Sequence, residues 1–415
     1  MSSFGSAYRV TVFGSSHGPH VGVTVEGLPG GFAPDFSALR SFLERRAPGR
    51  SELSSVRREE DAPDFTAGLE NGVCTGGPLT AIIPNRDVRI EDYVNLQTIP
   101  RPGHADYPAM VKLGAAYESG GGEFSGRMTV GLCVAGGLAL QLLQRRGIEI
   151  FAKEVEIGGV RDESRFASTI LAAKSAGDSV GGVIACTVTG LPIGVGGAMW
   201  DGLESAVSAA VFGIPAVKGV EFGDGFGAAA RLGSENNDEY YVNSNSIALR
   251  TNHAGGVLGG MADGMPLVFR VAVKPTPSIA KPQRSVELSA LRETELCVSG
   301  RHDPCIVPRA VPCVEAAAAC ALLDALLAEE RGGDLAALRL EIDRADRELL
   351  RAFDRRMEVA LRIGQWKKAN GMAVLDRSRE AAKLDAVAAA STHPEAAREL
   401  YETLMRLSRE EQAQL

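Results

Sequence analysis

Glycine is distributed so unevenly along this chain that the two ends are expected to fold differently. Residues 1–332 contain 45 of the 48 glycines, together with 29 Lys and Arg residues and 37 Asp and Glu residues. Residues 333–415 contain 3 glycines, together with 15 Lys and Arg residues and 15 Asp and Glu residues. Charged residues are thus about 20% of the first part and about 36% of the second. Glycine supplies turns and weakens helices. The shift at Arg331-Gly332-Gly333-Asp334 predicts two domains, at 1–330 and 334–415.

The composition of the whole chain argues against several protein classes. Its 415 residues are 45% hydrophobic and 23% charged, as in ordinary globular proteins. The net charge of −8 argues against nucleic acid as the main partner. No apolar run of 18 residues predicts a membrane span, and the first five residues lack a signal-peptide pattern. The seven cysteines contain no Cys-x-x-Cys pair, which indicates buried thiols in a cytoplasmic protein, without a metal site.

Short apolar runs separated by glycine-rich turns fill the first part of the chain. The predicted strands are Arg9–Phe13, Val21–Val25, Leu79–Ile83, Met128–Val134, Val183–Val188 and Leu267–Val273. The predicted helices are Phe36–Arg45, Gly136–Arg146, Leu203–Ala210 and Ala310–Ala328. The last helix is apolar nearly all round and is expected to be buried. Strands and helices mix without a βαβ rhythm, which favours an α+β fold over doubly wound α/β.

One uninterrupted helical pattern opens the second part. It extends from Asp334, a plausible N-cap, to about Asn370, and Gly371 is a plausible C′ residue. Some 35 residues at 1.5 Å each make a rod of about 50 Å, too long for a small globule to cover, so a partner chain is expected. Its apolar stripe consists of Leu338, Ile342, Ala345, Leu349, Phe353, Ala360 and Gly364. Two shorter helices are predicted at about Arg377–Ala390 and Pro394–Gln414.

Five polar motifs in the first part lie at predicted strand ends or among glycines. They are Gly14-Ser15-Ser16-His17-Gly18, Arg101-Pro102-Gly103-His104-Ala105-Asp106, Gly120–Arg127, Lys274-Pro275-Thr276-Pro277-Ser278 and Gly300-Arg301-His302-Asp303-Pro304-Cys305. Taken singly each is weak, because a loop histidine is usually structural and a glycine triplet usually makes a turn. None matches G-x-G-x-x-G or Walker A. Jointly they indicate an anionic substrate, a phosphorylated cofactor and two histidines that move protons near neutral pH.

These motifs, together with Arg45–Gly49 and Asn252–Gly256, closely resemble chorismate synthases in order and spacing. The resemblance extends to about residue 328. It implies a layered sandwich of sheets and helices. It also implies an anti-1,4-elimination of phosphate from 5-enolpyruvylshikimate-3-phosphate, which gives chorismate. Reduced FMN would be required, because the flavin lends electron density as phosphate leaves and then recovers it.

The resemblance assigns roles to residues at matching positions. His17 would protonate the departing phosphate, His104 would serve the reduced flavin ring, and Asp303 would assist proton removal at the flavin. Substrate or flavin would be held by Ser16, Arg46, Arg127 and Arg301. The FMN site would further include Glu123, Phe124, Ser125, Ala216, Gly259, Lys274, Pro275, Thr276, Pro277 and Ser278. Phosphate departure needs cations and a proton donor, which these residue types supply.

Four cations stand out in the second part: Arg339, Arg356, Lys367 and Arg379. Arg356 and Lys367 are eleven residues apart, within about 20° of the same helix face, whereas Arg339 points about 100° away from Arg356. Pattern alone favours a salt-bridged helical bundle used for dimerisation. The competing interpretation is a cationic pocket for a small dicarboxylate.

The order and spacing of these residues resemble the all-helical AroQ-type chorismate mutases, a three-helix family. There an interwound dimer places one arginine of each long helix in the partner's site, a role that Arg339 matches. The other matches are Arg356, Lys367, Asp376, Arg379, Glu380, Ser408 and Gln412. The implied reaction is a pericyclic rearrangement of chorismate to prephenate. Arginines would clamp the two carboxylates, while Lys367 and Gln412 donate to the ether oxygen.

The two resemblances predict a bifunctional shikimate-pathway enzyme whose first domain makes what its second consumes. One alternative is that the helical module is regulatory or dimerising without catalysis. Another makes the first part a net flavin oxidoreductase. A homotetramer with paired mutase domains is expected, because synthases of this family are usually tetramers and these mutases dimers. The sequence leaves open whether the chain reduces its own FMN with NAD(P)H.

Overall fold

The computed structural model describes residues 2–49, 51–54, 59–87, 96–114, 121–243, 246–298, 302–331 and 335–413. The chain divides into two compact units, Met1–Glu330 and Arg331–Leu415, and each is treated by itself. Several sequence predictions fall outside the described parts, among them the position of Arg301, the cap at Asp334, the helix end at Gln414 and the side chains of Leu338 and Arg339.

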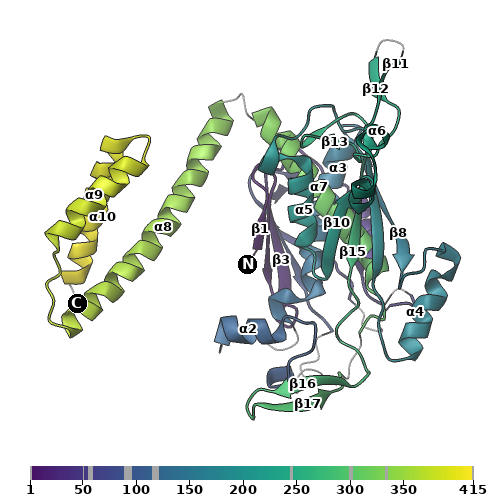
Figure 1. Cartoon of the computed structure of the whole chain (residues 1–415), viewed down its shortest axis with the longest axis horizontal. Helices are drawn as coiled ribbons and strands as arrows, with labels where there is room; N and C mark the ends of the chain where they lie inside the picture. Colours follow the sequence, from purple (N-terminus) through teal and green to yellow (C-terminus); the bar gives the residue numbers. More distant parts are fainter. Residues whose placement is uncertain are drawn as a thin grey trace. The chain divides into compact units, whose positions relative to one another are not determined.

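An antiparallel sheet of order β1-β2-β3-β7-β4 forms one layer of the first unit (Figure 1). Its strands are β1 (Ser2–Phe4), β2 (Arg9–Gly14), β3 (His20–Glu26), β7 (Leu79–Pro84) and β4 (Asp64–Ala67). Val21, Val23 and Val25 of β3 are at most 1% exposed. Because their side chains point to one face of the strand, that face lies on the core.

A second antiparallel sheet forms the opposite layer, with the order β10-β15-β9-β8. Its strands are β10 (Val217–Phe222), β15 (Leu267–Val273), β9 (Gly182–Thr189) and β8 (Glu149–Ile157). Leu267, Phe269 and Val271 of β15 are fully buried at alternate positions. This sheet therefore also turns one face to the core.

Two apolar helices, α3 (Thr129–Gln144) and α7 (Val307–Arg331), lie between the sheets (Figure 1). Helix α3 contacts β2 and β3 of the first sheet and β8 of the second. At Gly136, an added Cβ would lie 2.2 Å from the Cβ of Ala316 on α7, so only glycine permits this crossing. Residues 316–323 of α7 are at most 1% exposed, which confirms the predicted buried helix. The predicted layered α+β sandwich is likewise confirmed.

The predicted strand Met128–Val134 is wrong. The chain there forms a 3₁₀ turn, η4 (Gly126–Met128), and then the first turns of α3, so the helix expected at 136–146 begins seven residues earlier. Val130, Cys133 and Val134 are fully buried. A segment that is buried on every side carries no polar face to reveal the helical period, and its β-branched residues resemble a core strand.

The remaining elements of the first unit surround the sandwich. The helices are α1 (Phe36–Arg46), α2 (Asp106–Leu113), α4 (Phe166–Ser175), α5 (Leu203–Phe212) and α6 (Gly233–Asn236). The 3₁₀ turns are η3 (Gly122–Phe124), η5 (Glu163–Arg165), η6 (Met199–Asp201) and η7 (Gly225–Ala230). Four short strand pairs are β5 (Leu69–Glu70) with β6 (Val73–Cys74), β11 (Tyr240–Asn243) with β12 (Ser246–Leu249), β13 (Val257–Leu258) with β14 (Met261–Ala262), and β16 (Gln283–Glu287) with β17 (Arg292–Leu296).

Two helical segments are long and apolar enough to cross a membrane by length and composition alone. They are Gly126–Gln144 and Val307–Glu330, and their most apolar windows are 61% and 83% buried within the fold. Both belong to the central helix layer, where core helices meet the same criterion.

The second unit consists of α8 (Leu335–Ala369), α9 (Arg377–Ala390) and α10 (Pro394–Ala413), close to the predicted bounds. Gly371 has φ +65°, and the N–H of Met372 donates to the carbonyl of Lys367 at 2.9 Å, so the predicted C′ residue closes a Schellman turn. Helix α10 packs on both α8 and α9. On the stripe of α8, Ala360 is 7% exposed, but Ile342 is 61% exposed.

Candidate active sites

A cavity of about 590 Å³ opens in the first unit. Its lining brings together thirteen of the residues predicted from sequence: His17, Arg46, His104, Glu123, Phe124, Ser125, Arg127, Ala216, Lys274, Thr276, Pro277, Ser278 and Asp303. Three other predicted residues lie off the lining. Ser16 is fully buried beside His17, Pro275 precedes Thr276, and Gly259 occupies the turn between β13 and β14 with φ +62°.

His17 is held by the loop that follows β2. The Ser16 hydroxyl lies 2.9 Å from His17 Nδ1, and the Ser16 N–H donates to the carbonyl of Gly122 at 3.2 Å. Ser16 is fully buried, so its hydroxyl is fixed in place. The ring of His17 is therefore oriented by Ser16 while it lines the cavity.

Asn85, directly after β7, ties this loop to the arginine cluster and was not singled out from the sequence. Its side-chain amide donates to the carbonyls of Ser15 and Gly18 at 3.0 and 2.8 Å. Its amide oxygen accepts from Arg127 Nε at 2.9 Å. One side chain thus sets the positions of the His17 loop and of Arg127 together. A lone asparagine after a strand carries no motif that could have revealed this role.

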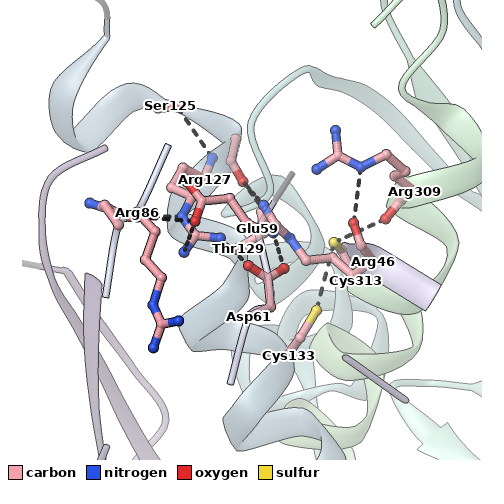
Figure 2. Close-up of polar contacts among 12 residues, drawn as sticks. Arg46, Glu59, Asp61, Arg86, Ser125, Arg127, Thr129, Cys133, Arg309 and Cys313 are labelled. Carbon is pink, nitrogen blue, oxygen red and sulfur yellow. Dashed lines mark hydrogen bonds and ion pairs between the residues drawn. The ribbon is translucent and has the colours of Figure 1, made fainter. Parts of the chain in front are cut away.

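Two buried arginines share one buried aspartate (Figure 2). Arg46 Nη1 donates to Asp61 Oδ2 at 2.5 Å, and Arg127 Nη1 donates to Asp61 Oδ1. All three side chains are at most 5% exposed. Burial alone would raise the pKa of Asp61, but the charges of Arg46 and Arg127 outweigh it and hold that pKa below its usual value. Arg127 Nη2 also lies 4.0 Å from Glu59 Oε2, so at the wall of the cavity these two cations face two buried carboxylates.

Arg309 of α7 adds a third guanidinium to this wall. Its Nη1 donates to Asp303 Oδ2, and its Nε donates to the carbonyl of Arg46 at 2.9 Å. Burial lowers the pKa of Arg309, partly offset by the charge of Asp303. Asp303 therefore lies at the cavity as the ion-pair partner of Arg309 (Figure 2 shows Arg309 beside Arg46).

His104 stands at another part of the lining, on a loop before α2. Its Nδ1 lies 2.6 Å from Asp106 Oδ1, and Asp106 also accepts from Arg101 Nε at 2.7 Å and from Arg101 Nη2 at 2.8 Å. Burial alone would raise the pKa of Asp106, but the hydrogen bonds from Arg101 and His104 outweigh it and hold that pKa far below its usual range. Arg101 Nη1 also donates a hydrogen bond to Ser278 Oγ at 3.0 Å. A buried carboxylate thus orients the second histidine.

The residues after β15 form a seat with the chemistry of a phosphate site. Lys274 Nζ donates to the carbonyl of Gly103, and burial together with the nearby charge of Lys218 lowers the pKa of Lys274. Among the described residues, the buried hydroxyl oxygen of Thr276 has no hydrogen-bond partner. A buried hydroxyl of this kind, beside two lysines and Ser278 on one lining, fits the phosphate of a bound nucleotide.

In the second unit, polar residues of α8 and α10 meet. Arg356 Nη1 donates to Ser408 Oγ at 2.5 Å and to the carbonyl of Leu404 at 3.0 Å. Gln412 Nε2 donates to the carbonyl of Ala360 at 2.7 Å. Ser408 is 7% exposed. The structure thus brings Arg356 and Ser408, two of the residues that the resemblance had named, into direct contact.

Three further predicted residues gather at the start of α9. Asp376 caps the helix by accepting from the backbone N–H of Arg379 at 3.1 Å. That hydrogen bond, with others from Ser378 and the charge of Lys367, lowers the pKa of Asp376. Lys367 Nζ itself donates to the carbonyl of Val374 at 2.6 Å.

Glu380, one turn into α9, binds a residue that the sequence reasoning missed. Both of its carboxylate oxygens accept from Arg409 Nη1, at 2.5 and 2.6 Å. Arg409 follows Ser408 directly on α10, but no pattern in the sequence pointed to it. The pair joins α9 to α10 beside the Arg356–Ser408 contact.

Comparison with known proteins matches both units. Residues 8–327 match the family model described as chorismate synthase, and residues 338–413 match the model described as chorismate mutase type II. A chorismate synthase of Lancefieldella parvula is 44% identical over 365 residues, covering 78% of this chain and 96% of that protein. A chorismate synthase of Chitinophaga pinensis is 45% identical over 332 residues, covering 80% of this chain and 98% of that protein.

A solved structure, the crystal structure of a chorismate synthase, is similar at a TM-score of 0.61 and 25% sequence identity. The alignment covers 82% of this chain and 98% of that one.

Proposed function

The chain belongs to the chorismate synthase family and continues into a type II chorismate mutase domain, and from this premise we propose how each unit performs its step. It is a bifunctional enzyme of the shikimate pathway, in the biosynthesis of aromatic amino acids. Residues 1–330 carry the synthase and residues 334–415 the mutase. The synthase eliminates phosphate from 5-enolpyruvylshikimate-3-phosphate, and the mutase converts the resulting chorismate to prephenate.

One observation carries the synthase proposal: two oriented histidines and a buried group of arginines face one cavity. A departing phosphate requires positive charge and a proton. The buried Arg46 and Arg127, with the partly buried Arg309, supply the charge at the cavity wall, where burial strengthens it. His17 donates the proton to the phosphate, with its ring held by Ser16.

The family uses a reduced flavin, and we propose that this chain binds it as FMN. Bound reduced FMN supplies electron density to the substrate as phosphate leaves. Lys274 and Ser278, with the unpaired Thr276 hydroxyl, hold its phosphate. The remaining FMN contacts come from Pro275, Pro277, Ala216, Gly259, Arg301 and residues 123–125. His104, fixed by Asp106, would serve the reduced flavin ring, and Asp303 would assist proton removal at the flavin.

The mutase site selects the compact conformer of chorismate and stabilises charge on its breaking ether bond, so it needs neither nucleophile nor metal. Arg356 and Arg379 bind the carboxylates. Lys367 and Gln412 donate to the ether oxygen. Asp376, Glu380 and Ser408 complete the site by binding the substrate or by holding these cations, as Ser408 holds Arg356.

We propose that Arg339 completes the site of a second copy of the chain, in a dimer of mutase domains. The support is the stripe on α8, where Ile342 and Leu349 are 61% and 52% exposed in a single chain. Paired mutase domains are compatible with a homotetramer of synthase units. The seven cysteines are free thiols, which supports a cytoplasmic location.

Product analysis on the whole chain tests both proposals. The protein is supplied with 5-enolpyruvylshikimate-3-phosphate and reduced FMN under anaerobic conditions, and phosphate, chorismate and prephenate are followed in time. The native chain is expected to form prephenate, and an Arg356→Ala variant to stop at chorismate. Accumulation of chorismate by the native chain would support the alternative of a non-catalytic helical module. Stoichiometric NAD(P)H oxidation during turnover would instead indicate a net oxidoreductase.

A further inference from the structure

Two cysteines lie sulfur to sulfur behind the arginine cluster (Figure 2). Cys133 of α3 and Cys313 of α7 have their Sγ atoms 3.8 Å apart. Their exposed fractions are 0% and 3%, and Cys313 also belongs to the cavity lining. Neither thiol has a role in the elimination or the rearrangement, and a small molecule that enters the cavity reaches Cys313.

The two thiols differ in how readily they lose a proton. Cys133 donates its S–H to Cys313 Sγ at 3.8 Å, and Cys313 in turn donates to the carbonyl of Arg309 at 3.5 Å. The hydrogen bond from Cys133, aided by the charges of Arg46 and Arg309, outweighs burial and lowers the pKa of Cys313 to about 7, and it raises that of Cys133. By contrast, burial raises the pKa of Cys320, two turns further along α7, well above its usual value. Cys313 is thus the nucleophile of the pair.

The packing of the two helices suits a covalent bond between these sulfurs. Cys133 precedes Gly136 by three residues, and Cys313 precedes Ala316 by three residues, so each cysteine lies one turn from the crossing of α3 and α7. At that crossing there is no room for a Cβ on Gly136. A disulfide has an S–S length of about 2.05 Å, so the sulfurs need to approach by about 1.8 Å.

We propose that Cys133 and Cys313 are a reversible redox site that forms a disulfide at the wall of the synthase cavity, with a small hydroperoxide as the oxidant. The Cys313 thiolate attacks the peroxide, forming an S–O bond and breaking the O–O bond, and the released oxygen takes up a proton. The sulfur of Cys133 then attacks Cys313. An S–S bond forms, and the hydroxyl leaves as water with the proton of Cys133. The two thiols lose two electrons, which reduce the peroxide.

The disulfide acts on the synthase through the cation cluster. It removes the ionisable thiol of Cys313 beside Arg46 and Arg309, and it shifts a residue of the α7 turn that carries Arg309. Because groups that bind a reacting anion must be placed to within about 0.5 Å, synthase activity is expected to fall at least tenfold. Residues 331–415 contain no cysteine, so the mutase activity of the same chain is a control for general damage.

The test uses the full-length chain with Cys297→Ser, because Cys297 is an exposed thiol. Hydrogen peroxide is added at a dose that oxidises thiolates before thioethers, and peptide mass mapping locates the oxidised cysteines. A linked Cys133–Cys313 peptide is expected, with a fall in the ratio of synthase to mutase activity that dithiothreitol reverses. Cys133→Ser is expected to stop at a sulfenic acid on Cys313, trapped by dimedone. Cys320→Ser is the matched control, and it is expected to keep both the Cys133–Cys313 link and the reversible fall in the activity ratio.

A second arm tests the connection to the cavity. Inorganic phosphate, which binds the arginines as the leaving group does, is expected to slow disulfide formation severalfold, because it occupies the route to Cys313 and competes for its cations. The proposal is overturned if the folded protein forms no Cys133–Cys313 link, if the link leaves the activity ratio unchanged, or if phosphate has no effect. It is also overturned if the link forms only in urea concentrations that unfold the chain.

Discussion

Replacing Asn85 by Asp separates the two tasks of this side chain. The carboxylate keeps an acceptor for Arg127 Nε, now as an ion pair, but it places an oxygen against the carbonyls of Ser15 and Gly18, where the amide donated two hydrogen bonds. Each lost bond removes about 0.5–1.5 kcal/mol of restraint on the His17 loop, or about 1–3 kcal/mol together. At about 1.4 kcal/mol per factor of ten, kcat for chorismate formation should fall about 5- to 140-fold.

The assay is steady-state chorismate formation, with kcat and KM measured separately. Because Arg127 keeps its partner, KM in Asn85→Asp should stay within about threefold of the native value. Asn85→Ala removes the acceptor as well and should change both constants. FMN binding, followed by flavin fluorescence, should be unaffected in Asn85→Asp. A kcat within threefold of native in Asn85→Asp would refute the reasoning that this amide positions His17.

Three further predictions concern proton transfer, acid stability and subunit assembly. His17→Ala and His104→Ala should each lose about 10²–10⁴-fold in chorismate formation with FMN binding largely intact; a loss under tenfold in both contradicts their roles. The folded-state pKa of Asp61 is depressed, so its contribution to stability is complete above its unfolded pKa of about 3.9 and is lost as pH falls through the folded pKa. Urea unfolding below pH 4 should show this loss, and Asp61→Asn should weaken the pH dependence; an unchanged dependence would contradict it. Arg339→Ala and Lys367→Ala should each be nearly inactive as mutases, yet regain about half of native activity per mixed dimer when co-expressed, and confirmed mixed dimers without recovery would exclude a shared site.

Much of the site could be predicted because its residues occur in motifs. His17, Arg127 and Lys274 stand in strings that follow strands or glycines, and they meet at one cavity. The residues that hold them could not be found in this way. Asn85 and Asp61 are isolated polar residues whose partners lie far along the chain, at Arg127 for both. Hydrogen bonding across such separations leaves no local pattern in the sequence.

Secondary structure could be predicted from the sequence where one face of an element is polar. The prediction failed where an element has no polar face. The stripe of α8 and the alternation in β3 indicate their own periods. The start of α3 does not, because Val130 and Val134 are buried on both sides between the sheets. Only the close packing of Gly136 on Ala316, which is a property of the assembled layers, explains why a helix is required there.

The fully buried stretch of α7 determines how the cavity can respond to its ligands. Amide hydrogens in residues 316–323, enclosed on every face, should exchange with solvent only through global unfolding. Arg309 and Cys313 stand at the beginning of this same helix, whereas His17 and His104 stand on loops. This wall of the cavity should therefore move less on ligand binding than the histidine loops, and accommodation of substrate and flavin falls to those loops. Ligand binding should slow hydrogen exchange in those loops and leave α7 unchanged.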